Sequence, residues 1–377
     1  MNKVDIKKRI HIVLGHDHHN PLGIIRSLGE NGIKPIAIII KGKVQIASKS
    51  KYISKLYLVD KFEDVHEILI NEYANVKEKP FIYMSDDVMT SFFDEHYDEL
   101  KDKFYFYNAG QNGKLNYYMD KINIGKLAEK CGLEVAKMWL VKKGEFPKDI
   151  QYPIITKACN SKMENWKSEV HICNNKQELV EAYKKIKSKE IILQRYIIKK
   201  NEIAVSGVSV NKGKDVLYTM EINFNYLLPD TYSYYMSVKN FEGYNIINKM
   251  NKLFSEIGFE GIFEIEFLLG ENNKKYFLEI NFRPTAWNYA STVAGMPMPI
   301  IWAESMINKR CLKDRFKKYE KFNAMLEFND YKTRVKKQKM SFFKWFKEFC
   351  KSKCKYNYNR KDMKPFFSIL KSYIIRK

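Results

Sequence analysis

The stretch Phe259–Met298 constrains the fold most, because it reads as two β-strands that bring several acids together. The strands are expected at Ile262–Leu269 and Lys275–Phe282, joined by a turn at Asn272-Asn273. Asparagine tolerates a positive φ, so this pair suits a two-residue hairpin turn. Side chains alternate along a strand, and the register predicts one apolar and one polar face. The apolar face contains Phe263, Ile265, Phe267, Leu278, Ile280 and Phe282, and the polar face contains Glu264, Glu266, Glu279, Asn281 and Arg283.

The polar face needs an explanation, because it is expected to put Glu266 opposite Glu279 and Glu264 opposite Asn281. Two carboxylates about 4 Å apart repel by roughly 4 kcal/mol at an effective dielectric near 20, and like charges across a strand pair are destabilising. Either nearby lysines neutralise the acids through salt bridges, or a divalent cation binds there. Mg²⁺ takes oxygen ligands, usually one or two carboxylates plus substrate phosphates. The pattern therefore favours a cation site.

The segment E-I-N-F-R-P at Glu279–Pro284, with Glu266 thirteen residues before its first acid, resembles the metal-binding end of ATP-grasp enzymes. The resemblance is to carboxylate–amine ligases of the carbamoyl-phosphate-synthase and D-aspartate-ligase type. It implies that Glu266, Glu279 and Asn281 hold Mg²⁺, with Mn²⁺ as a substitute. It also implies that Arg283 is catalytic and contacts the phosphoryl group and the reacting intermediate. The family pattern has proline before this arginine, where the present chain has Phe282.

The same resemblance implies an ATP site in the middle of the chain. Its lysines bind the phosphates, a linker between two half-domains reads adenine through its backbone, and an acid accepts hydrogen bonds from the ribose hydroxyls. The implied cofactor-binding residues are Lys121, Lys157, Gln194, Arg195, Tyr196, Ile197 and Glu202. For Lys157 and Glu202, plain solvent exposure remains the alternative.

The loop Asn160–Glu169 departs from the family pattern, because it contains no glycine. Glycine lets backbone N–H groups approach phosphate oxygens closely. Lys162 and Lys167 are expected to supply side-chain charge in its place. The departure puts full activity in question.

The first part of the chain reads as a βαβ unit with a parallel sheet, with strands at Arg9–Leu14 and Lys34–Ile40. It resembles the pre-ATP-grasp domain, in which motifs like the RSLG of Arg26–Gly29 and the S-K-Y of Ser50–Tyr52 recur. The run His16-Asp17-His18-His19 invites a metal interpretation, but adjacent loop residues cannot all face one ion. A loop at the carboxyl end of a strand is where α/β sheets bind ligands, so His16 and Asn20 are candidate substrate contacts.

The expected fold class is α/β, with α+β character in the ATP-grasp part. A parallel-sheet pre-ATP-grasp domain is expected at residues 1–112, an ATP-grasp domain of two α+β halves at 113–310, and a basic, aromatic, helical C-terminal tail at 311–377. No apolar run reaches the ~18 residues needed to span a membrane, and no signal peptide is recognisable. The six cysteines form no CxxC pair, which suits a reducing cytosol. The sequence therefore predicts a cytoplasmic location.

The net charge of +22 is concentrated at the C-terminus. Residues 309–377 carry 23 Lys/Arg against 6 Asp/Glu, which gives +17 and leaves +5 for the first 308 residues. A basic, aromatic helix is expected at Lys339–Lys353, with Phe342, Phe346 and Phe349 along one side. Such a helix can lie in an anionic membrane interface, pack its aromatics on the catalytic body, or bind nucleic acid. Nucleic acid is the least favoured of the three, because no reading module accompanies the helix.

The implied function is an ATP-dependent ligase that joins a carboxylate to an amine through an acyl phosphate. The expected partners are small-molecule carboxylate and amine substrates. Addition of an amino acid to a cell-wall or surface-glycan precursor is a hypothesis that fits a tail at the inner face of the membrane. The alternative is a non-catalytic nucleotide-binding module, which the glycine-free loop permits, or a membrane-associated adaptor.

Overall fold

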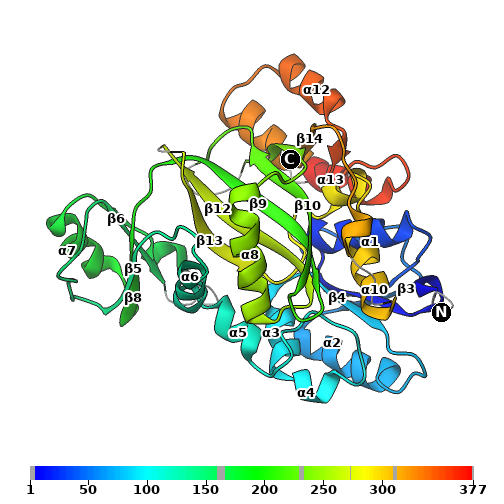
Figure 1. The fold of residues 1–377 in the computed structure, drawn as a ribbon. Coiled ribbons are helices and arrows are strands. Elements are labelled where there is room, and N and C mark those ends of the chain that lie inside the picture. The colour runs from blue at the N-terminus through cyan, green and yellow to red at the C-terminus, as the bar shows by residue number, and fades with distance from the viewer. Residues whose placement is uncertain (1–4, 159–165, 229–232, 272, 309–311, 376–377) are drawn as a thin grey trace. The chain divides into compact units, whose positions relative to one another are not determined.

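The computed structural model describes residues 5–158, 166–228, 233–271, 273–308 and 312–375, and the fold is α/β (Figure 1). The chain forms two compact units. Unit 1 consists of Met1–Asn116, Ile203–Ile265 and Ile280–Lys377, and unit 2 of Tyr117–Glu202 and Glu266–Glu279. The predicted domain boundaries at 112/113 and 310/311 stay predictions.

The N-terminal part of unit 1 is a parallel sheet, as predicted. Its strands are β1 (His11–His16), β2 (Ile36–Ile40), β3 (Lys55–Val59) and β4 (Phe81–Met84), in the order β3-β2-β1-β4. Its helices are α1 (His19–Gly29), α2 (Phe62–Ile68) with a π-helical turn at Leu69–Tyr73, α3 (Asp87–Glu95) and α4 (Tyr97–Leu100). Tyr105 adds a single bridge to this sheet, to Phe81.

The largest sheet has the order β13-β12-β9-β10-β11-β14-β15. Its strands are β9 (Lys199–Val210), β10 (Asp215–Phe224), β11 (Tyr235–Lys239), β12 (Gly261–Gly270), β13 (Lys275–Asn281), β14 (Phe322–Met325) and β15 (Cys354–Lys355). Its helices in sequence order are α8 (Tyr244–Ile257), α9 (Tyr289–Val293) and α10 (Met298–Asn308). The boundary between the two units falls within β9, β12 and β13.

The predicted hairpin is present, but its turn differs from the prediction. The N–H of Gly270 donates to the Lys274 carbonyl at 3.0 Å, and Asn273 has φ +58°; Asn272 lies outside the described residues. A two-residue turn at 272–273 would pair residue 271 with 274, so the ladder starts one residue away from the predicted register. A one-residue slip exchanges the faces of a strand, which explains why Phe277 rather than Leu278 lies against Phe267, with ring centroids 6.1 Å apart. This turn does not produce the predicted direct opposition of Glu266 and Glu279.

The prediction of one apolar and one acidic face is also wrong for β12. All residues from Gly261 to Phe267 are buried, because β12 is an inner strand of the sheet and both of its faces are covered. Glu264 is 1% exposed and accepts hydrogen bonds from the hydroxyls of Ser206 and Thr285, each at 2.8 Å. This acid is thus held by hydroxyl donors, as a buried carboxylate requires.

Unit 2 contains an antiparallel sheet of the order β5-β8-β6-β7. Its strands are β5 (Met138–Lys142), β6 (Ile154–Ala158), β7 (Ile172–Cys173) and β8 (Glu190–Arg195), and its helices include α6 (Lys121–Lys130) and α7 (Lys176–Lys185). A core of Ile154, Leu179, Ile191 and Leu193 joins the sheet to α7. Helix α5 (Lys114–Met119) ends just before α6, because the Asp120 carboxylate caps α6 by accepting from two backbone N–H groups.

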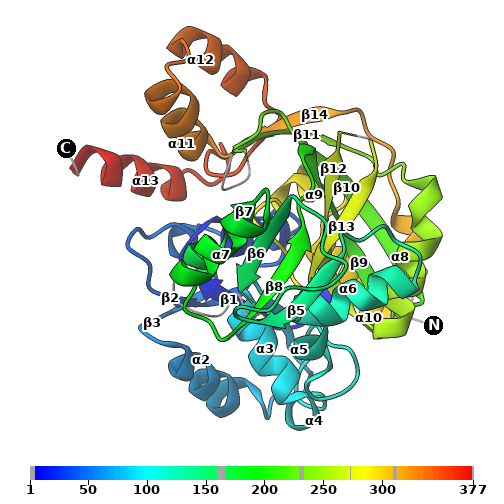
Figure 2. The ribbon, with the colours of Figure 1, turned by 90° about the vertical axis from the view of Figure 1, so that its left-hand side faces the viewer.

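The C-terminal residues belong to unit 1 and contain α11 (Glu327–Asp330), a π-helical segment at Tyr331–Lys337, α12 (Phe342–Lys351) and α13 (Lys364–Ile375) (Figure 2). β14 pairs with β11 and β15 pairs with β14, so the predicted tail contributes two strands to the large sheet. No helix in the described part of the chain is long and apolar enough to cross a membrane.

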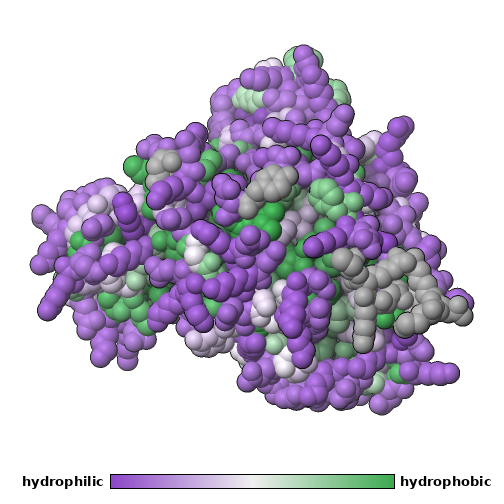
Figure 3. All heavy atoms as spheres, viewed as in Figure 1, coloured by the Kyte–Doolittle hydropathy of each residue, from purple (hydrophilic) through white to green (hydrophobic). Residues whose placement is uncertain are grey.

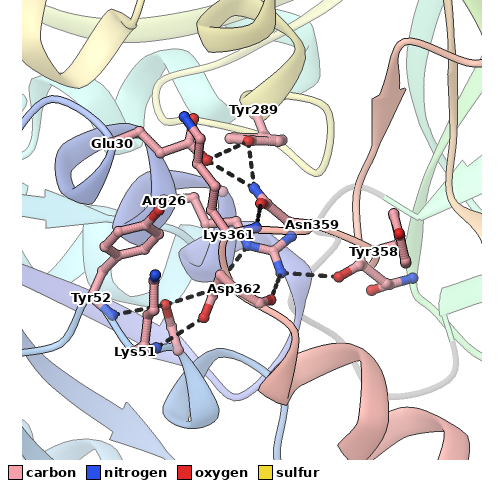
Figure 4. A network of polar contacts seen from close by, with 12 residues as sticks. Arg26, Glu30, Lys51, Tyr52, Tyr289, Tyr358, Asn359, Lys361 and Asp362 are labelled. Carbon is pink, nitrogen blue, oxygen red and sulfur yellow. Dashed lines mark hydrogen bonds and ion pairs between the residues drawn. The ribbon is translucent and has the colours of Figure 1, made fainter.

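A buried ion pair attaches this C-terminal segment to the parallel sheet's first helix (Figure 4). Arg26 of α1 and Asp362 have fully buried side chains, and the Arg26 Nε lies 3.0 Å from the Asp362 carboxylate. Arg26 also donates to the carbonyls of Tyr356, Asn357 and Asp362. The Asp362 carboxylate accepts from the Ser50 hydroxyl at 2.8 Å and from the Lys51 N–H at 2.9 Å. Residues of the RSLG and S-K-Y motifs therefore hold residues 356–362 in place.

Candidate functional site

Unit 2 brings together four of the residues predicted to bind the nucleotide and the metal. Lys157 on β6 donates from Nζ to Oε1 of Gln194 on β8 at 2.6 Å. Lys121, the first residue of α6, lies with its Nζ 3.7 Å from the carboxylate of Glu279 on β13. The two pairs are electrostatically coupled, because Lys121 and Glu279 both affect the pKa of Lys157. We name these four residues the lysine cluster.

The lysine cluster is suited to an anion. Burial, and after it the neighbouring Lys121, lower the pKa of Lys157 to about 8, and Glu279 acts in the opposite direction. The cluster has two ammonium groups and one carboxylate, that of Glu279, and a phosphate group would supply further negative charge. The residues present thus fit the phosphates of a nucleotide.

The remaining predicted nucleotide contacts also lie in unit 2. The backbone N–H groups of Arg195 and Tyr196 donate to the carbonyls of Lys137 and Pro153, each at 2.9 Å. These two N–H groups have protein partners. The predicted role of the backbone at residues 194–197 in binding adenine stays a prediction. Glu202 is mostly buried, with a side chain 16% exposed, and it pairs with Lys199 at 2.6 Å. The alternative of plain solvent exposure is wrong for Glu202, while its ribose role stays a prediction.

The predicted metal ligands are two carboxylates and one amide. Glu279 and Asn281 are two residues apart on β13, so strand alternation directs both side chains to one face. Glu266 on β12 is 8% exposed. Among the described residues, no group of three or more His, Cys, Asp or Glu side chains is arranged to hold a metal. The metal role of Glu266, Glu279 and Asn281 stays a prediction, and Mg²⁺ commonly completes its ligands with substrate phosphates. Most of the glycine-free loop, including Lys162, lies outside the described residues.

Unit 1 holds the predicted catalytic arginine in a second polar cluster. Arg283 makes a bidentate pair with Asp87, with Nε and Nη2 at 2.7 and 2.8 Å from the two carboxylate oxygens. Asp86 caps α3 by accepting from the Met89 N–H at 2.9 Å, and it lies 3.2 Å from the His16 ring. The parallel geometry of the Arg283 fork matches a carboxylate. We name Arg283, Asp86, Asp87 and His16 the arginine cluster.

The charges in the arginine cluster affect one another. The hydrogen bond to Asp86 raises the pKa of His16 above its usual value. Burial alone would raise the pKa of Asp86, but His16, the Met89 N–H and nearby Arg283 lower it overall. Burial lowers the pKa of His18 to about 4, so this ring is neutral at physiological pH. His18 accepts from the Asn20 N–H at 3.0 Å and thereby caps α1.

The His16–His19 run and Asn20 lie at the carboxyl end of β1, as predicted. Their side chains have different partners: His16 contacts Asp86, while Asp17 accepts from the backbone of residues 46 and 48. Asn20 donates to the Ser85 carbonyl at 3.2 Å. The predicted contact of His16 and Asn20 with substrate requires a position at the carboxyl end of a strand, and both residues lie there. The contact itself stays a prediction.

Sequence reasoning missed Asp86 and Asp87. They directly follow β4, and β1 and β4 are parallel neighbours. The carboxyl ends of parallel strands meet at one edge of the sheet, so the S-D-D sequence at 85–87 was a usable signal. Its partner Arg283 is 196 residues away in the chain, and no local pattern could have joined them.

The chain has similar sequences among known proteins. No family model matches the chain. N5-carboxyaminoimidazole ribonucleotide synthase from Staphylococcus aureus (strain COL) is 26% identical over 262 residues, covering 64% of this chain and 67% of the relative. D-alanine–D-alanine ligase from Fusobacterium nucleatum is 27% identical over 174 residues, covering 44% of this chain and 56% of the relative. The chain is similar to ATP-grasp carboxylate–amine ligases.

Solved structures show the same fold for this chain. N5-carboxyaminoimidazole synthetase from Staphylococcus aureus gives a TM-score of 0.63 at 15% identity, covering 88% of this chain and 86% of that one. L-amino acid ligase from Bacillus licheniformis gives 0.62 at 12% identity, covering 84% and 80%. The biotin carboxylase domain of 2-oxoglutarate carboxylase from Hydrogenobacter thermophilus, solved with MgADP and bicarbonate, gives 0.64 at 16% identity, covering 84% and 74%.

These findings confirm the predicted family and enzyme class. The homologues of this chain are ATP-dependent carboxylate–amine ligases that form C–N bonds. The predicted cofactors, ATP and Mg²⁺, agree with neighbours whose structures contain ADP or MgADP.

Proposed function

We propose that this ATP-dependent carboxylate–amine ligase adds an amino acid to a cell-wall or surface-glycan precursor. The lysine cluster supports the ATP-dependent part of the proposal, because it brings two cations, Lys157 and Lys121, beside a single acid, Glu279. The amino-acid part is supported by relatives named for ligation of D-alanine and of L-amino acids. The precursor part is supported by the basic aromatic surface of the C-terminal helices.

In this proposal each half of the reaction has its own cluster. Bound MgATP supplies the phosphoryl group that activates the substrate carboxylate as an acyl phosphate. Lys121 and Lys157 neutralise phosphate oxygens, and Glu279, Asn281 and Glu266 hold the metal. Preorganised charges of this kind need no reorganisation as charge develops, which is the usual basis of electrostatic catalysis.

Arg283 has the role of binding the carboxylate and stabilising the negative charge that develops when the amine attacks. The Asp87 carboxylate in its fork shows which shape of anion the guanidinium accepts. His16 and Asn20 at the neighbouring strand end are the proposed further contacts to substrate. Gln194, Arg195, Tyr196 and Ile197 retain the adenine role, and Glu202 the ribose role.

The proposed location is cytoplasmic, with peripheral attachment to the inner face of the membrane. A surface precursor carried on a lipid would be presented there. The exposed aromatic residues and lysines of the C-terminal helices α12 and α13 support this attachment.

An ADP-release assay with Mg²⁺ tests the proposal. The protein is incubated with ATP and a pool of amino acids and sugar-linked carboxylates, and the pool is then divided until one carboxylate and one amine suffice. Lys157→Met should lose ADP release, while the matched variant Lys148→Met, on an exposed loop of the same unit, should retain it. A non-catalytic nucleotide-binding module would be stabilised by MgATP and release no ADP with any pool.

A further inference from the structure

The helices α12 and α13 expose an unusual share of large apolar side chains. Of the fifteen large hydrophobic residues exposed among the described residues, six lie on these two helices. They are Phe342, Phe343 and Phe346 on α12, and Phe367, Leu370 and Tyr373 on α13. Phe343 is 82% exposed. Figure 3 shows hydrophobic side chains among hydrophilic ones at the upper tip, where Figure 1 places α12.

The aromatic rings of the two helices are in continuous contact. Phe343, Phe342, Phe346 and Phe349 follow one another on α12 with centroids 5.8 to 6.0 Å apart. Phe349 lies 6.1 Å from Tyr358, Tyr358 lies 5.5 Å from Phe366, and Phe366 lies 5.9 Å from Phe367 on α13. We name these residues, with Leu370 and Tyr373, the aromatic face. Because the contacts are unbroken, both helices present parts of one surface.

The opposite side of α12 is fixed to the body of unit 1. Trp345 is 8% exposed, packs with Tyr235 and Met325, and donates from its indole N–H to Asp330 at 2.8 Å. Asp330 also pairs with Arg334. This anchoring prevents α12 from rotating its exposed phenylalanines inward. The exposed aromatic residues are therefore a permanent feature of the surface.

The charges beside the aromatic face have one sign. Lys344, Lys347 and Lys351 on α12 and Lys364 and Lys371 on α13 are exposed. The acid of α12, Glu348, is paired with Arg334, and α13 has no acid in its sequence. At 100° per residue, Lys347 follows Phe343 around α12, with Lys351 and Lys344 beyond it. This is the arrangement of a helix that lies in a membrane interface, with apolar residues below and lysines at the headgroups.

We propose that the aromatic face docks the protein on an anionic lipid bilayer. This deepens the proposed function, because it brings the ligase to a substrate carried on a membrane. Charge complementarity selects this occupant, since five lysines without a free acid on the two helices match negative headgroups. A second copy of the chain would present the same positive charges and repel the first. A short array of large apolar side chains has no counterpart on the charged backbone of duplex nucleic acid.

Vesicle co-sedimentation of the full chain tests the proposal. Binding is measured to phosphatidylcholine vesicles and to vesicles with phosphatidylglycerol added. The wild type should bind the anionic vesicles and lose binding as salt rises, because exposed charges are screened within about 8 Å at physiological ionic strength. Lys344→Gln/Lys347→Gln/Lys351→Gln should weaken binding on the order of a hundredfold, from about 1 kcal/mol per basic residue. Phe343→Ser/Phe346→Ser/Phe367→Ser should abolish it.

Control variants test whether vesicle binding depends on the aromatic face or on the charge and hydrophobicity of the whole protein surface. Lys148→Gln/Lys185→Gln/Lys189→Gln removes three exposed lysines of unit 2, and Phe316→Ser removes an exposed phenylalanine outside the face; neither should change vesicle binding. The variants of the face should keep the wild-type stabilisation by MgATP, which shows that they are folded. ADP release in solution is measured on the same preparations. Vesicle binding without ADP release would overturn the proposed function alone, and ADP release without vesicle binding would overturn the docking proposal alone.

Three other results would also overturn the docking proposal. These are equal binding to neutral and anionic vesicles, self-association that the phenylalanine variant abolishes, and tighter binding to nucleic acid than to anionic vesicles at equal salt.

Discussion

Removal of the Asp362 carboxylate should destabilise unit 1 strongly. Asp362→Ala leaves the Arg26 guanidinium buried without its counter-ion, and breaking a buried pair in this way costs about 3–5 kcal/mol. Arg26 retains three backbone carbonyls as acceptors, so we expect the lower end, about 3 kcal/mol. Domains are stable by only about 5–15 kcal/mol. The change should therefore remove a large part of the stability of the unit.

Urea unfolding followed by tryptophan fluorescence measures this effect. With an m-value near 3 kcal/mol/M, the midpoint should fall by about 1 M. The matched control is Asp60→Ala, which breaks the exposed Lys41–Asp60 pair, in which Asp60 is 77% exposed; it should change stability by less than about 1 kcal/mol. Adding Arg26→Met to Asp362→Ala should cost much less than the sum of the single changes, because the orphaned charge is then absent. If Asp362→Ala unfolds like the wild type, the C-terminal segment is not held by this pair and our reasoning fails.

Four further predictions concern the two clusters. The pKa of Lys157 is lowered from 10.5 to about 8 in the folded protein. Between these pH values the unfolded chain binds more protons than the folded one, so this group makes the free energy of unfolding rise with pH. Lys157→Met should remove that rise in urea titrations from pH 7.5 to 10. Glu279→Gln should lower the Lys157 pKa further and abolish ADP release without raising ligand-free stability, because Glu279 pairs with Lys121; a gain in stability would contradict this pairing. Asp87 competes with the substrate carboxylate for Arg283, and a half-exposed ion pair of this kind is worth about 1 kcal/mol. Asp87→Asn should therefore lower the KM for the carboxylate substrate roughly fivefold. An unchanged KM would show that Arg283 does not bind the substrate. MgATP at a hundredfold excess over Kd should stabilise the protein by about 2.7 kcal/mol, and ATP with a chelator by much less in the same thermal-shift assay.

The strands were predictable because their signal is local. Period-two alternation and the flanking turn residues place both strands of the hairpin, and β12 and β13 agree with the expectation within one residue at each end. The register was not predictable to the same degree, since it depends on the length of the turn. One additional residue, with Asn273 at positive φ, exchanges the faces and changes which side chains lie together. The predicted opposition of two glutamates depended on that one residue.

The site was predictable only as far as a motif or a family resemblance extends. No local sequence pattern links the four residues of the lysine cluster, Lys121, Lys157, Gln194 and Glu279. Only the family resemblance grouped them before the structure showed their contacts. Asp87 shows the limit, because a surface aspartate after a strand has many ordinary explanations until its partner Arg283 is known.

The C-terminal segment shows the same limit in its strongest form. Charge counting correctly finds an excess of +17 in 69 residues, yet the excess does not distinguish a solvated tail from a folded layer with a charged surface. The deciding contact joins Arg26 to Asp362 across 336 positions, and each residue alone looks like one more charge in a highly charged chain. Burial of both makes the segment part of the fold, while the lysines that flank the aromatic face remain exposed. A basic, aromatic sequence can thus be both core and interface, because different faces of the same helix serve each purpose: Trp345 anchors α12, and Phe343 is left for a partner.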